Sequence, residues 1–131
     1  MRTPERSPDL EALVAKDPWI DDVYEYAGRW DVPSLCGIRL QRSGTRLTVV
    51  ATELYDKNPG TSVTAMAGKL VEWLAAEHGV APNQTTLVVR CPGRGSKLSC
   101  YDETFDLFEP GSDGAGHWVR MTAAEVEALL P

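Results

Sequence analysis

The stretch that decides the fold runs from RLTVVATEL (46–54) through TSVTAMAGKLVEWLAAEHG (61–79) to TTLVVRC (85–91). In the first segment, residues of both parities are apolar or small, which is typical of a strand that is covered on both faces. The last segment is a second apolar strand pattern, with Leu87, Val89 and Cys91 on its inner face. A strand, a helix and a second strand of this length can form a parallel crossover.

The middle segment predicts an amphipathic helix that covers the sheet. Thr61 or Ser62 can accept hydrogen bonds from the free N–H groups at its start, and Gly79 is a typical C-terminal stop. One stripe of apolar side chains recurs with the helical period: Val63, Met66, Ala67, Leu70, Trp73 and Leu74. We therefore expect one long central helix that buries this stripe.

Strands and a terminal helix are predicted on either side of this unit. Residues 36–42 alternate and reach the 46–54 strand through Ser43-Gly44, which predicts a β-hairpin. Residues 98–108 contain one long or two short strands, and residues 117–121 a short edge strand. Thr122 and Glu125 have the spacing of a capping box, which opens a last helix.

The N-terminal third is less regular. Residues 1–8 have the composition of a flexible tail, and Asp9 can cap a short helix over residues 10–16. Residues 18–30 allow a helix from Pro18 to about Tyr26 or a strand over residues 23–26, and we favour the helix.

These elements together predict a single α+β domain over residues 9–131. Its sheet is expected to be mixed, mostly antiparallel, with four to six strands. One long central helix and short N- and C-terminal helices are expected to pack on one face of that sheet.

Composition restricts the class of protein. The chain has 131 residues, of which 43% are hydrophobic and 24% charged, so one folded domain is expected. No apolar run is long enough to cross a membrane, and no export signal is recognisable, which predicts a cytoplasmic location. The net charge of −6 disfavours nucleic acid as a partner. Three cysteines without an export signal predict reduced thiols.

The best candidate for a ligand site is the segment that leaves the 46–54 strand. A helix N-terminus after an inner strand suits an anion, because its N–H groups are free and its dipole is positive. Turn formation at Asn58-Pro59-Gly60 and simple capping by Thr61 explain the same residues without a ligand. The ligand-binding set under this hypothesis is Glu53, Asp56, Lys57, Asn58, Gly60, Thr61 and Ser62.

Other groups capable of catalysis or metal binding are poorly spaced. The three cysteines, His78 and His117 show no short Cys-x-x-Cys or His-x-x-x-His pattern. The acidic run from Asp102 to Asp113 lacks the ligand spacing of a calcium loop. We therefore predict no catalytic residues, no metal and no cofactor.

Aromatic residues are numerous near the N-terminus and suggest a docking surface. Trp19, Tyr24, Tyr26 and Trp30 are the candidate interface, since aromatic side chains are enriched at binding hot spots and are also good core residues. The favoured hypothesis is a non-catalytic module that binds a protein partner or self-associates, or an accessory subunit of a complex. The alternative is a small-ligand-binding or phosphoryl-processing enzyme that uses residues 53–62.

Overall fold

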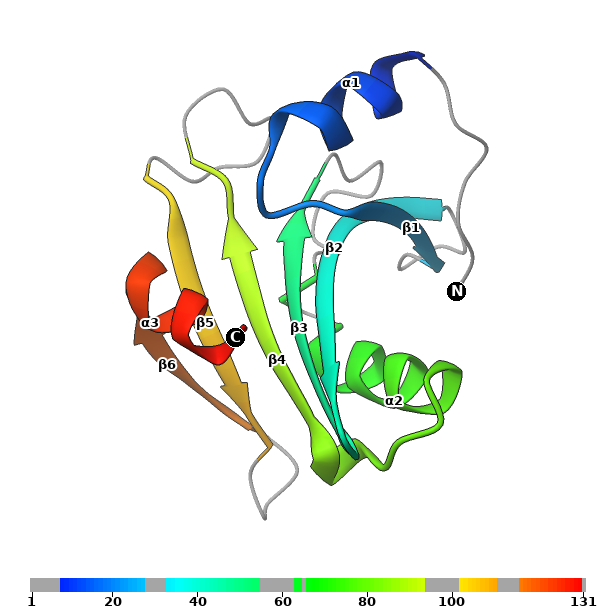
Figure 1. Ribbon diagram of the computed structural model, residues 1–131, viewed down its shortest axis with the longest axis vertical. Helices are drawn as coiled ribbons and strands as arrows, with labels where there is room; N and C mark the ends of the chain where they lie inside the picture. The colour runs from blue at the N-terminus through cyan, green and yellow to red at the C-terminus, as the bar shows by residue number, and fades with distance from the viewer. Residues whose placement is uncertain are drawn as a thin grey trace.

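The computed structural model describes residues 8–27, 33–54, 63–64, 66–93, 102–110 and 116–130. Its centre is one six-stranded sheet (Figure 1). The strands are β1 (Asp22–Ala27), β2 (Pro33–Ser43), β3 (Arg46–Glu53), β4 (Thr85–Cys91), β5 (Thr104–Glu109) and β6 (His117–Met121). The helices are α1 (Pro8–Lys16), α2 (Ala67–Glu77), the short 3-10 helix η1 (Pro82–Gln84) and α3 (Ala123–Leu129).

The order of the strands in the sheet is the order in the chain. β3 and β4 are parallel and are joined through α2, whereas every other neighbouring pair is antiparallel. The expected mixed, mostly antiparallel sheet is therefore confirmed, and it has six strands. The β2–β3 hairpin turns at Gly44, whose φ of 62° is a conformation that glycine adopts without a steric penalty.

The helices cover both faces of the sheet, so the expectation that they all pack on one face is wrong. On one face, α2 packs against Leu47, Val49 and Leu87. On the other, Val126 of α3 belongs to a cluster with Val50 and Val88 (Figure 1). The reason lies in β3 and β4, because consecutive residues of each are apolar and each face therefore needs its own cover.

The predicted helix start at Thr61 or Ser62 is also wrong, because α2 begins at Ala67. Its N-cap, Met66, makes no side-chain capping hydrogen bond. Before it, Met66 N–H donates to the Val63 carbonyl and Ala67 N–H to the Thr64 carbonyl, which are turn contacts rather than helical ones. The hydroxyl of Thr64 is bonded to Glu53 instead of capping the helix. The helix thus has eleven residues and is not the long central one expected.

The preference for a helix over residues 18–26 is wrong as well, and the alternative strand is confirmed. Residues 22–27 form β1, which pairs with β2 with Asp22 opposite Ile38. Val23 points into the core at 2% exposure. Aromatic and β-branched residues favour strands, and pairing with the neighbouring β2 outweighs the weak helical pattern of so short a segment.

The ends of the described chain differ slightly from expectation. The first helix begins at Pro8, one residue inside the predicted tail, while residues 1–7 lie outside the described residues. The predicted strand over 98–108 is described only as β5, from Thr104. The capping box of Thr122 and Glu125 is confirmed at the start of α3. None of the helices in the described ranges is long and apolar enough to cross a membrane.

Candidate functional site

The most polar part of the interior lies at the carboxyl ends of the two parallel strands. Thr52, near the end of β3, pairs with Arg90, near the end of β4. Both residues are buried, Thr52 completely and Arg90 at 5% exposure. Ligands of open α/β sheets commonly bind at this end of the strands, so the position is a candidate site.

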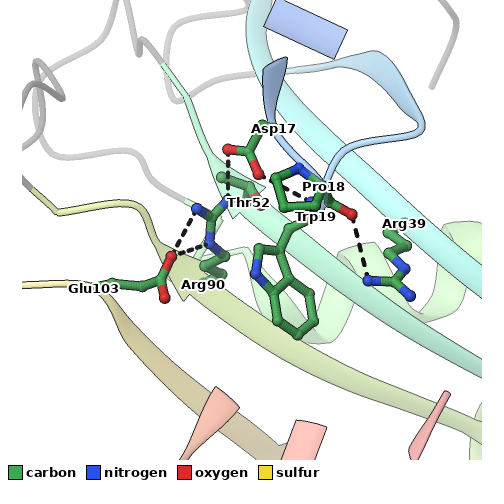
Figure 2. Close-up of polar contacts among 7 residues, drawn as sticks. All are labelled: Asp17, Pro18, Trp19, Arg39, Thr52, Arg90 and Glu103. Carbon is green, nitrogen blue, oxygen red and sulfur yellow. Dashed lines mark hydrogen bonds and ion pairs between the residues drawn. The ribbon is translucent and has the colours of Figure 1, made fainter. Parts of the chain in front are cut away.

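Two carboxylates from distant parts of the chain converge on Arg90 (Figure 2). The Asp17 Oδ2 atom lies 2.8 Å from Arg90 Nη1. Glu103 Oε2 accepts from both Arg90 Nε, at 3.0 Å, and Arg90 Nη2, at 2.8 Å. The Thr52 hydroxyl accepts from Arg90 Nη1 at 3.2 Å. We refer to Asp17, Thr52, Arg90 and Glu103 as the Arg90 cluster.

A second arginine holds the residues that follow Asp17. Arg39 of β2 donates to the Pro18 carbonyl at 3.3 Å, and its guanidinium carbon lies 5.2 Å from the centre of the Trp19 ring. The indole also packs on Phe105, with ring centroids 4.8 Å apart. The segment between α1 and β1 is therefore fixed to the sheet by two arginines and one buried tryptophan (Figure 2).

The geometry of the Arg90 cluster favours a structural role over ligand binding. All three nitrogens of the guanidinium already donate to protein oxygens, and the cluster carries two carboxylates for one cation. An anionic ligand would have to displace one of the two carboxylates from Arg90 and would be repelled by the other. What the cluster does is connect the residues before β1, the start of β5 and the β3–β4 pair.

Sequence reasoning did not single out the Arg90 cluster, although one signal was present. Arg90 follows Leu87, Val88 and Val89 in a strand read as apolar. A charged residue inside such a strand is almost never buried without a partner, so it predicts at least one carboxylate nearby. Asp17 is 73 residues away in the chain, and no local pattern identifies it as that partner.

The segment proposed as a ligand site, residues 53–62, is described only at its start. Glu53 lies on the α2 face of the sheet, where its Oε1 accepts from the Thr64 backbone N–H at 3.1 Å and from the Thr64 hydroxyl at 2.6 Å. The Glu53 carboxylate therefore links the end of β3 to the residues just before α2. The other proposed ligand residues lie outside the described residues: Asp56, Lys57, Asn58, Gly60, Thr61 and Ser62.

The cysteines are in two different states. Cys36 is a free, fully buried thiol, and burial raises its pKa to about 12. Cys91 is disulfide-bonded, so the expectation of reduced thiols is wrong at this position. The remaining cysteine, Cys100, lies outside the described residues. Within the described ranges, no three His, Cys, Asp or Glu side chains are grouped so that they could hold a metal ion.

Of the four aromatic residues proposed as an interface, the structure describes the side chains of Trp19 and Tyr24. Trp19 is 7% exposed and belongs to the core cluster on the α3 face. Tyr24 is half-buried against the cluster under α2, and burial, followed by the charge of Asp22, raises its pKa. The Tyr26 side chain and Trp30 lie outside the described residues.

The exposed apolar surface lies instead on β6, at the edge of the sheet (Figure 1). Trp118 and Val119 are the exposed large hydrophobic side chains of the described chain, at 38% and 40%. Trp118 packs on Phe108 of β5, with ring centroids 5.1 Å apart. Because the two residues are consecutive, one lies on each face of the sheet.

Comparison with known proteins adds no relative to this picture. No protein-family model, no curated protein and no solved structure matches the chain.

Proposed function

We propose that this protein is a non-catalytic interaction module, or the accessory subunit of a complex, which binds its partner by adding a strand to β6. The observation that carries the proposal is the position of Trp118 and Val119, which are exposed on opposite faces of a strand at the edge of the sheet. An edge strand presents unpaired backbone N–H and C=O groups, which pair with an extended segment of a partner.

The side chains of β6 leave this edge open. Protein edges are commonly protected by proline or by charged side chains that project over them. β6 contains no proline. Its arginine, Arg120, forms an ion pair with the neighbouring strand β5, where its Nε lies 2.7 Å from Asp106 Oδ1. His117 is likewise paired with Glu109 of β5.

The proposal does not depend on the compartment. The cytoplasmic location expected from the sequence is compatible with it, and so is an oxidising environment that maintains the Cys91 disulfide. Cys91 is on β4, which β5 separates from β6. The alternative of a phosphoryl-processing enzyme draws no specific support from Glu53, whose carboxylate is already bonded to Thr64.

Selection of extended peptides tests the proposal. A library of twelve-residue peptides is selected on the wild-type protein, and binding of the enriched peptides is measured by fluorescence polarisation at submicromolar protein. Val119→Lys places a charge on the edge and should weaken binding at least tenfold. Ala76→Lys adds the same charge at an exposed position of α2 and should leave binding unchanged. Failure to enrich any peptide, or equal binding by both variants, would contradict the proposal.

A further inference from the structure

We infer that the occupant of β6 is a second copy of this chain, which pairs antiparallel through its own β6 and joins two sheets into one. The inference rests on the proposed function and names the partner. Within the described part of the chain, β6 is paired on one side, with β5, and no described strand pairs with its outer side.

The register follows from the length of β6. Residues opposite one another in an antiparallel pair lie on the same face of the sheet. In a symmetric pair of β6 strands, one residue therefore lies opposite its own copy, and the possible registers differ in which residue that is. Val119 is the central residue of the five in β6. Only the register that places Val119 opposite Val119 of the second copy pairs all five residues.

Both neighbouring registers are poorer. A shift in one direction places Arg120 opposite Arg120, and like charges directly opposite destabilise a sheet. A shift in the other direction brings Gly116 opposite Arg120. Gly116 has a φ of 69°, which is not an extended conformation, so the ladder would be interrupted there.

The central register also brings complementary side chains together. Trp118 of each copy lies opposite Arg120 of the other, on the same face. Arg120 is 66% exposed in its side chain and already touches Asp106, so its guanidinium can reach the indole face and keep that ion pair. Val119 meets Val119 on the opposite face. Both exposed apolar side chains of β6 are thus covered by one self-complementary contact.

Charge does not oppose pairing at the β6 edge. The chain carries a net charge of −6, which opposes self-association in general. In the β5–β6 strip, however, Asp106 and Glu109 are paired with Arg120 and His117. These two carboxylates therefore each have a basic partner on the same strip.

The contact is small, so the dimer is expected to be weak. Five paired residues extend over roughly 17 Å. Interfaces of this size fall below the usual area of stable complexes, and we expect a dissociation constant on the order of 100 µM. Sedimentation velocity of the wild-type chain between about 5 µM and 1 mM should show a monomer–dimer equilibrium. Val119→Lys should remain a monomer throughout, and Ala76→Lys should behave as the wild type.

Cysteine cross-linking tests the register. Val119→Cys should form a disulfide-linked dimer on mild oxidation, because the two Cα atoms would lie roughly 4.5–5.5 Å apart. His117→Cys is the matched control. In the inferred register, its two copies are four residues apart along the strands, or roughly 13 Å, and should not cross-link. The wild type, with its native cysteines, sets the background.

Several results would overturn the inference. They are a wild-type protein that stays monomeric at 1 mM, dimers that persist in Val119→Lys, and equal cross-linking by both cysteine variants. Growth beyond the dimer would point to open-ended pairing of β6 with β1 and would overturn it too. If the chain is monomeric but selected peptides still bind β6, the proposed function stands and only the identity of the partner changes.

Discussion

Replacing Arg90 by methionine should destabilise the protein by about 2–4 kcal/mol, because it removes the only cation of a buried cluster with two carboxylates. The Arg90 side chain is 7% exposed and that of Asp17 is 17% exposed, so Asp17 would be left with its charge and little water. Removing one partner of a buried ion pair typically costs about 3–5 kcal/mol. The expected value is lower here because the Glu103 side chain is 41% exposed and can turn toward solvent.

Urea unfolding followed by tryptophan fluorescence measures this loss. Arg120→Met is the matched control, since its ion pair with Asp106 is exposed and should contribute less than about 1 kcal/mol. A double-mutant cycle between Arg90→Met and Asp17→Asn should give a coupling of about 1.5–3 kcal/mol, larger than a cycle with Glu103→Gln. A cost for Arg90→Met no larger than the control, or zero coupling to Asp17, would refute the assigned role of the cluster.

Further perturbations probe the core and the first turn of α2. Cys36 should resist thiol reagents at pH 8 in the folded protein and react with them on unfolding. Folding raises its pKa from 9.0 to about 12, so the folded state favours the neutral thiol. The free energy of unfolding should therefore fall by about 1.4 kcal/mol per pH unit as the pH rises from 9 to 12. Chemical unfolding across this range measures the slope; an equal slope in Cys36→Ala would contradict the assignment to Cys36. Gly37→Ala should cost about 1–3 kcal/mol, because its Cβ would lie 2.7 Å from atoms of the buried Ile20 side chain. Gly68→Ala should stabilise α2 by about 0.5–1 kcal/mol, because no atom lies within 4 Å of the position its Cβ would take. Thermal melting that ranks the two glycine variants in the opposite order would be inconsistent with the structure.

The regular strands and the capping box of the last helix were predictable from the sequence, because their signals are local. β4 has the predicted bounds, 85–91, and the final capping box lies where its spacing places it. The start of α2 was not predictable in the same way. Thr61, Ser62 and Thr64 are all plausible caps by residue type, and what decides is the contact of Thr64 with Glu53 eleven residues earlier.

The surfaces of the sheet were harder to predict than its strands. The double-sided apolar pattern of β3 already required cover on two faces, yet the short α3 carries few signals that assign it to the second face. The exposure of Trp118 depends on how much of the sheet α2 and α3 leave uncovered. No local sequence pattern predicts that area. Asp17 and Arg90 meet across 73 residues, so their pairing follows from the tertiary fold alone.

The agreement between chain order and sheet order affects how the protein is made. Each new strand leaves the ribosome when the strand it pairs with already exists, so the sheet can grow from one side without waiting for later segments. The face that contains Val50 and Val88 is different, because Val126 of α3 reaches it only after β6 has been synthesised. Until then Val50 and Val88 lack this part of their cover, and Trp19 and Phe105 are the large buried side chains of that cluster already in place.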